Sequence, residues 1–218
     1  MPRAFHPIVL LGAFVLLAGG VAGCRATTPA TFDPSARDVS SIEAPGLDPD
    51  SRPDWYRDYM VRGPEHAVLD RFVGRWTFEI RSWLAPGMPE IPPDSGTCEY
   101  EWIMDGRFLR GRYDMTLLGE PYEAEDTLAY DRYRGEYLAT WIDTTRTSVR
   151  VARGTYDADR AELTMSGTDD DPIMDRRDQP FRSVARFVSD DEIVFELFSR
   201  APDGELFVAS VVTARRVR

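Results

Sequence analysis

The stretch DRFVGRWTFEIRSW, residues 70–83, decides the fold because its hydrophobic spacing changes partway along. Up to Gly74 the apolar residues recur at the spacing of a helix, as Leu69 and Phe72 do. After Gly74 they alternate with polar residues, starting at Trp76, as in a half-buried strand. We therefore expect the chain to enter its first strand from a short helix, through a glycine, on a tryptophan.

Beyond this stretch the chain keeps the two-residue period of strands, and turn residues interrupt it at short, even intervals. Asp105-Gly106 and Pro202-Asp203-Gly204 are examples of these turns. No helical stretch of useful length follows Gly74. The runs with strand character are 75–84, 97–104, 107–117, 121–130, 135–143, 147–156, 161–168, 180–188, 192–200 and 205–215.

Short strands joined by tight hairpins exclude a fold built from βαβ units and leave a sandwich or a barrel. Because sequence neighbours are joined by hairpins, the strands form a meander, and closing the meander removes both exposed edges. We therefore predict an all-β fold. It is a single antiparallel up-and-down barrel of about ten strands with a short N-terminal helix.

The first 24 residues have the outline of a bacterial lipoprotein signal. Arg3 precedes an apolar run from Ile8 to Leu17, and small residues follow it. The segment Val21-Ala22-Gly23-Cys24 resembles a lipobox, whose cysteine becomes acylated at the new N-terminus. An ordinary signal peptide that happens to contain a cysteine is the alternative. We expect residues 1–23 to be a lipoprotein signal peptide and Cys24 to carry the lipid.

Residues 24–62 precede the domain, and from Arg25 to about Arg52 they are rich in Pro, Ser, Thr, Ala and Asp and have few apolar side chains. Such a stretch cannot bury enough apolar area to offset its ordering entropy, so we expect a flexible tether. The aromatic segment that follows, PDWYRDYMVRGP, is either one amphipathic turn docked on the domain or a partly ordered linker. Several acyl chains would hold the protein at a membrane. We expect an exported protein in the cell envelope, at the outer membrane if the cell is Gram-negative, since Arg25 rather than Asp follows the cysteine. The globular domain would span residues 63–218.

The net charge of −11 and the absence of lysine describe an acidic surface without a basic run. Nucleic-acid binding needs patches that neutralise phosphates, so we expect no nucleic-acid partner. The same charge argues against electrostatic docking on anionic lipid. The sequence does not indicate an oligomeric state.

Four segments of the domain carry a resemblance to a known family. They are GPEHAVLDRFVGRWTFEIRSWLAPG at 63–87, EWIMDGRFLRGRYD at 101–114, LAYDRYRGEYLATWIDTT at 128–145 and GTYDADRAELTMSGTDDDP at 154–172. Together they resemble the bacterial family DUF1579, a domain of unknown function, over the whole globular part of the chain. The resemblance implies a calycin-like barrel, the class of lipocalins and fatty-acid-binding proteins, and it implies no established activity.

The start of the first strand also resembles the Gly-x-Trp entry of lipocalins, through Gly74 and Trp76. In that class a short helix closes one barrel end, the Trp packs inside, and an Arg from the last strand lies across its face. The resemblance implies that Arg215 or Arg216 makes this cation–π contact, and we assign it to Arg215. These residues are therefore expected to close the barrel and not to bind a ligand.

The sequence offers few residues that could act in catalysis or bind a metal. Once residues 1–23 are removed, the only histidine is His66, which we expect to be a surface or cap residue. Apart from Cys24 the only cysteine is Cys98, which leaves no disulfide and is most simply a small core residue. The acidic loop at 168–178 lacks the spacing of an EF-hand. We therefore expect no metal, no cofactor and no catalytic residue.

Candidate ligand contacts are polar and aromatic residues on the aromatic-bearing strand faces. They are Tyr100, Trp102, Tyr113, Tyr137, Trp141 and Asp143. Tyr113 faces the interior only if Arg110 and Arg112, at alternate positions of the same run, point outward. We expect that arrangement because a buried unpaired guanidinium is expensive. Arginines inside the barrel would instead suggest a carboxylate ligand.

These observations favour a lipid-anchored barrel that binds a small, largely apolar molecule in its interior or at its open mouth. The alternative is an envelope scaffold or interaction module whose barrel is packed solid, which the many large aromatic residues would suit. An enzyme is the third hypothesis, and it would need His66 or a perturbed carboxylate facing the interior. A cavity inside the barrel separates the first hypothesis from the second.

Overall fold

The computed structural model describes residues 58–172, 175–201 and 204–218. The predicted signal peptide, Cys24 and the tether up to residue 57 lie outside these ranges. Within them, residues 58–60 are helical, and no helix has the length and apolar character needed to cross a bilayer. The elements from there on are η4 (Pro64–His66), α2 (Ala67–Asp70), β1 (Gly74–Ser82), β2 (Ile91–Ile103), β3 (Phe108–Leu117), β4 (Glu120–Asp131), β5 (Glu136–Asp143), β6 (Arg150–Asp157), β7 (Glu162–Asp171), β8 (Arg176–Phe187), β9 (Glu192–Arg200) and β10 (Leu206–Arg216).

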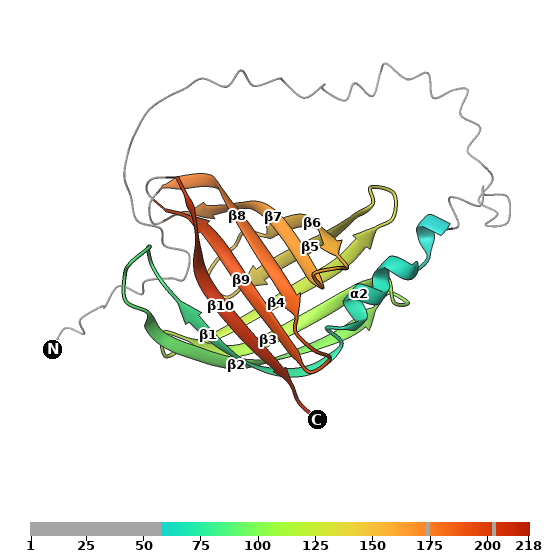
Figure 1. Cartoon of the computed structure of the whole chain (residues 1–218), viewed down its shortest axis with the longest axis horizontal. Coiled ribbons are helices and arrows are strands. Elements are labelled where there is room, and N and C mark those ends of the chain that lie inside the picture. The colour runs from blue at the N-terminus through green and yellow to red at the C-terminus, as the bar shows by residue number, and fades with distance from the viewer. Residues whose placement is uncertain (1–57, 173–174, 202–203) are drawn as a thin grey trace, which may run out of the picture. The chain divides into compact units, whose positions relative to one another are not determined.

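Each strand pairs antiparallel with its neighbour in sequence, and β10 pairs with β1, so the sheet closes into a barrel (Figure 1). The closing pair runs from Trp76 opposite Arg216 to Ser82 opposite Ser210. This confirms the predicted all-β fold, an antiparallel up-and-down barrel of ten strands with a short N-terminal helix. Closure leaves no unpaired sheet edge.

Aspartates fix two of the hairpin turns. The Asp131 carboxylate accepts hydrogen bonds from the backbone N–H groups of Tyr133 and Arg134, at 3.0 and 3.1 Å. Asp157 binds the N–H groups two and three residues later at the same two distances. These bonds stabilise the chain reversal locally and so set the register of the strands on either side.

Two strands begin earlier than the hydrophobic alternation predicts. β2 starts at Ile91 rather than at residue 97, and β8 starts at Arg176 rather than at residue 180. The added residues are mostly exposed or half-buried. They pair along the backbone without facing the core, so their side chains carry no alternation from which a strand could be predicted.

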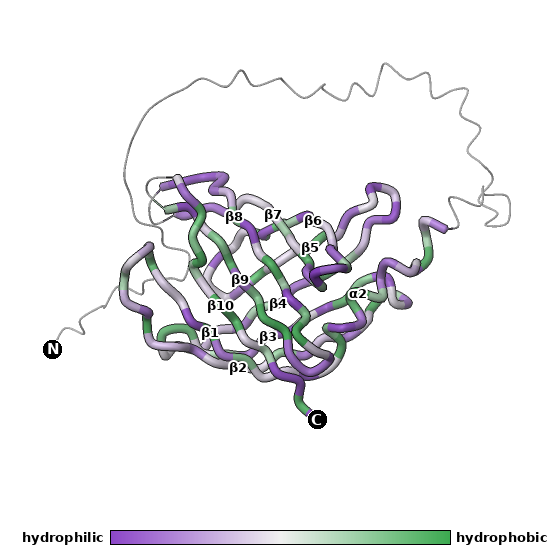
Figure 2. The backbone as a smooth tube through the Cα atoms, viewed as in Figure 1, coloured by the Kyte–Doolittle hydropathy of each residue, from purple (hydrophilic) through white to green (hydrophobic). Residues whose placement is uncertain are grey.

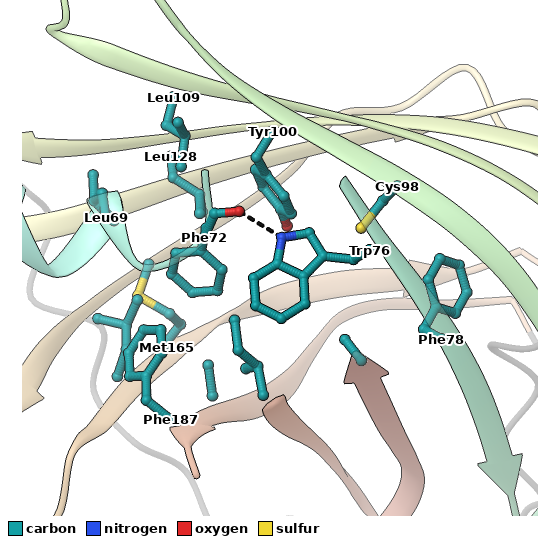
Figure 3. Packing of buried hydrophobic residues seen from close by; sticks show 14 of the residues in the cluster. Leu69, Phe72, Trp76, Phe78, Cys98, Tyr100, Leu109, Leu128, Met165 and Phe187 are labelled. Atoms are coloured by element: carbon teal, nitrogen blue, oxygen red, sulfur yellow. Dashed lines mark hydrogen bonds between the residues drawn. The ribbon is translucent and has the colours of Figure 1, made fainter. Parts of the chain in front are cut away.

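The core occupies the barrel end where β1 begins. Hydrophobic and hydrophilic residues alternate along the strands (Figure 2). Because successive residues of a strand face opposite sides, one set points into the barrel, and the buried cluster there is apolar. The largest fully buried side chains are Leu69, Phe72, Trp76, Leu109 and Ile193. Two of these, Leu69 and Phe72, come from α2 and the turn after it, and they pack into the same cluster (Figure 3). The short helix therefore plugs this end of the barrel.

The chain passes from the short helix into β1 through Gly74 and Trp76, as the sequence predicts. Gly74 has a φ of +113°, and a Cβ on it would lie 2.9 Å from Arg216 Nη1. Two residues later the Trp76 indole is 1% exposed, and its Nε1 donates a hydrogen bond of 2.7 Å to the Phe72 carbonyl (Figure 3). The tryptophan thus joins the helix to the first strand.

The arginine over Trp76 is Arg216, and the assignment to Arg215 is wrong. Arg216 Cζ lies 4.1 Å from the centre of the Trp76 ring, and its guanidinium donates to the carbonyls of Val73 and Arg71. The Nε of Arg215 lies 3.3 Å from Glu192 on the outer face. Successive residues of a strand face opposite sides, and Arg216 is the one that shares a side with the buried Ala214.

Candidate ligand cavity

The barrel interior beyond the plugged end holds a cavity of about 310 Å³ that is partly open to solvent. All ten strands contribute to its wall, and most of the lining side chains are apolar or aromatic. Phe78, Met115, Met165 and Phe195 are examples of this lining. The volume lies at the lower end of the range for small-molecule sites, roughly 300–1,000 Å³. The interior is therefore not packed solid.

A buried carboxyl group, Asp126 on β4, faces this cavity. Its Oδ2 accepts hydrogen bonds of 3.0 Å from the hydroxyl groups of Tyr100 and Tyr113. Its Oδ1 accepts a bond of 3.0 Å from the Gly111 N–H, and the two tyrosine hydroxyls also contact each other. Burial raises the pKa of Asp126 to about 6, although these three hydrogen bonds act in the opposite direction.

Strand register brings this cluster together. Gly111 on β3 stands opposite Tyr100 on β2 and opposite Asp126 on β4, so the three residues form one row across the sheet. A Cβ on Gly111 would lie 2.3 Å from Asp126 Oδ1 and 2.6 Å from the Tyr100 ring. Only glycine leaves room for the carboxylate and the tyrosine to lie side by side.

A second polar cluster lies at the end of the cavity away from α2. Arg146 Nη1 and Arg150 Nη2 reach the Asp169 carboxylate at 2.7 and 2.5 Å. Arg146 Nε lies 3.1 Å from Asp143 Oδ2. Burial disfavours ionisation of Asp143, but hydrogen bonds from Thr145 and the charge of Arg146 outweigh it and lower the pKa of this carboxyl. The two arginines are thus matched by two carboxylates.

Three of the six predicted contact residues line the cavity, namely Tyr100, Tyr113 and Trp141. Asp143 lies next to them, because Trp141 Nε1 donates a 3.1 Å bond to its Oδ2. Tyr113 faces inward as expected, since Arg110 lies on the outer face and pairs with Glu101 at 2.5 Å.

Trp102 and Tyr137 do not line the cavity and have another role. Trp102 Nε1 donates 2.9 Å to Asp70 Oδ1, and the Tyr137 hydroxyl donates 2.9 Å to the Glu65 carbonyl. Both partners belong to the helical segment that closes the barrel. Each of these two aromatic residues shares a strand face with a residue that lines the cavity, Tyr100 for Trp102 and Trp141 for Tyr137. They lie two and four residues away from it along their strands, nearer the plug.

Sequence reasoning missed Asp126, although a signal for it exists. In EAEDTL, residues 123–128, the alternation places Ala124, Asp126 and Leu128 on one face and the two glutamates on the other. Both glutamates are exposed, as that alternation requires. An acidic residue on the apolar face of a strand is the pattern that would have identified a buried carboxyl group.

The two remaining titratable candidates, His66 and Cys98, are both buried. His66 belongs to the helical segment that plugs the barrel and is buried there; its Nδ1 accepts a 3.2 Å bond from the Gly63 N–H, so it acts as a cap. Cys98 lines the cavity, and burial raises the pKa of its thiol to about 12. Such a thiol is not a nucleophile at neutral pH. Among the residues that the structure describes, no group of three or more His, Cys, Asp or Glu side chains is arranged to hold a metal.

The fold is similar to solved barrel structures at low sequence identity. Rv2717c from M. tuberculosis aligns with a TM-score of 0.54 and 15% identity, covering 72% of this chain and 100% of that one. The S-type phycobiliprotein lyase CPES from Guillardia theta aligns with a TM-score of 0.49 and 11% identity, covering 76% of this chain and 99% of that one. The first of these likenesses concerns the fold alone.

Sequence comparison identifies the family. Among curated proteins no match to this chain is found. The family described as "Protein of unknown function (DUF1579)" matches residues 62–216, which include every strand of the barrel. The chain belongs to the DUF1579 family.

Proposed function

We propose that this protein is a lipid-anchored envelope protein whose barrel binds a small, largely apolar molecule. The observation that carries the proposal is the cavity of about 310 Å³ inside the barrel with its mainly apolar wall. At roughly 30 Å³ for each water-sized group, such a space suits a ligand of about ten non-hydrogen atoms. Burying an apolar molecule of that size removes its surface from water, which drives binding.

The alternative of a packed interaction module is less well supported, because that barrel would have no cavity. An enzyme is the second candidate, since Asp126 is a perturbed carboxyl group facing the cavity. Its carboxylate oxygens accept three hydrogen bonds, and the nearby Cys98 thiol is held in its neutral form. We therefore assign Asp126 to ligand recognition and not to proton transfer.

Filling part of the cavity should weaken binding. In Ser183→Phe a ring would occupy space at the cavity wall, and we expect the affinity for decan-1-ol to fall at least about tenfold. The matched control is Val151→Phe, which adds a ring at a position that is 42% exposed. Calorimetric titration of residues 24–218, made without the signal peptide and therefore unacylated, measures both. Equal affinity in the two variants would contradict a ligand site inside the barrel.

The lipid anchor is tested through the two cysteines. In cells fed an alkyne-bearing fatty acid, we expect the protein to become labelled and Cys24→Ala to lose the label entirely. Cys98→Ala is the matched control and should keep it, because Cys98 is buried in the barrel. Labelling that survives Cys24→Ala, or a wild-type protein without label, would contradict the anchor. In-gel fluorescence of the purified proteins gives the readout.

A further inference from the structure

The cavity contains one acidic group that no cation balances. Asp126 accepts hydrogen bonds from Tyr100, Tyr113 and the Gly111 N–H, and those are its only polar contacts among the described residues. The chain has no lysine that could pair with it. A buried carboxylate without a cationic partner is expensive, so the site gains from any positive charge that enters the cavity.

The two arginines of the cavity wall do not supply that charge. Arg146 and Arg150 lie at the far end and share the Asp169 carboxylate, and Arg146 also contacts Asp143. Two guanidinium groups therefore face two carboxylates, and this cluster is neutral as a whole. When Asp126 is ionised, these four residues and Asp126 together carry one net negative charge.

The hydrogen-bond pattern around Asp126 is also short of protons. Three oxygen atoms, those of the two tyrosine hydroxyls and Asp126 Oδ2, are in mutual contact, which makes three contacts. Tyr100 and Tyr113 bring one proton each, so an ionised Asp126 leaves one contact without a hydrogen. A ligand group with several N–H donors would satisfy the spare acceptor capacity.

We propose that Asp126, together with Tyr100 and Tyr113, binds the protonated amino group of an aliphatic amine whose apolar body fills the rest of the cavity. The inference rests on the proposed binding function and gives the ligand a chemical class. An ammonium group supplies both missing elements, a positive charge and up to three donors, in a water-poor site where a charge-assisted hydrogen bond is strong. Phe78, Met115 and Phe195 would contact the apolar body.

Binding of the amine should depend on pH in one direction. The titratable groups that face Asp126 are Cys98 and Tyr100 on β2 and Tyr113 on β3, and from β5 it faces Trp141, which does not titrate. Burial raises the pKa of the thiol and of both hydroxyls, so these groups stay neutral. Asp126 has a pKa of about 6. Below that pH it gains a proton, and the affinity for the amine falls.

The test compares three ligands of equal length, namely decylamine, decan-1-ol and decanoate. Residues 24–218 are titrated with each at about pH 7.5 and about pH 5, where the amine keeps its proton because its pKa resembles that of lysine. We expect decylamine to bind at least about tenfold more tightly than the alcohol at the higher pH and decanoate to bind most weakly. At the lower pH the preference for the amine should shrink.

Asp126→Asn should remove the preference for the amine while decan-1-ol still binds. The matched control is Glu123→Gln, which neutralises an exposed carboxylate on the same strand and should leave the preference unchanged. Decanoate binding as tightly as the amine, or an amine preference that survives Asp126→Asn, would overturn the inference and leave the proposed function standing. If none of the three ligands binds to the wild-type protein, the proposed function fails instead.

Discussion

Replacing Trp76 with alanine lowers the free energy of unfolding by about 3–5 kcal/mol, as expected for a fully buried tryptophan. The variant would lose the indole that fills the plugged end of the barrel, which is 1% exposed in the wild-type protein. It would also leave the Phe72 carbonyl without its 2.7 Å hydrogen bond and Arg216 without the ring beneath it. Urea denaturation followed by circular dichroism measures the change.

A matched control exists in the same part of the chain. Trp83 follows the end of β1, is partly exposed, and has Arg81 stacked over it at 5.3 Å. Trp83→Ala should cost well under half as much, since its ring leaves no sealed void. Equal losses in the two variants would mean that the helix–tryptophan plug contributes no special stability to the barrel.

The fold could be predicted because most strands and turns have a recognisable pattern in the local sequence. Period-two alternation marks the inward face, and Asp131 and Asp157 supply turns whose hydrogen bonds lie within three residues. Closure also follows from simple physics, since a meander with free edges is a liability. What local signals do not give is the exact register, and the arginine over Trp76 depends on it. One residue of uncertainty in β10 separates Arg216 from Arg215.

The site was predicted only in part, for a related reason. Tyr100, Tyr113 and Trp141 line the cavity because aromatic residues on inward faces are easy to recognise. The alternation within one strand predicts which side chains face inward but not how far along the barrel axis they lie. Trp102 therefore could not be distinguished from Tyr100 two residues away. Asp126 escaped notice because it sits in an acidic run, and its burial depends on Gly111 in the neighbouring strand.

The free energy of unfolding of Asp126→Asn, compared with that of the wild-type protein, should be higher at neutral and alkaline pH than at acid pH. Burial raises the pKa of Asp126 to about 6, against about 3.9 for an unfolded aspartate. Between these values the folded state holds more protons than the unfolded state, so the wild-type protein loses stability as pH rises through about 6. Asparagine has no charge to bury. The stability difference between variant and wild type should therefore grow by up to about 3 kcal/mol from pH 4 to pH 8.

The sign of this change separates a buried carboxylate from a paired one. Asp143 has a lowered pKa, so the stability that it contributes is present above the unfolded pKa and is lost only below about pH 4. Asp143→Asn should accordingly lose stability by an amount that stays constant between about pH 5 and pH 8. Urea denaturation of both variants and the wild type across this range makes the comparison. A flat difference for Asp126→Asn would show that Asp126 ionises as easily in the folded barrel as in the unfolded chain. Burial would then impose no penalty on its charge, and the argument for an amine ligand would lose its electrostatic basis.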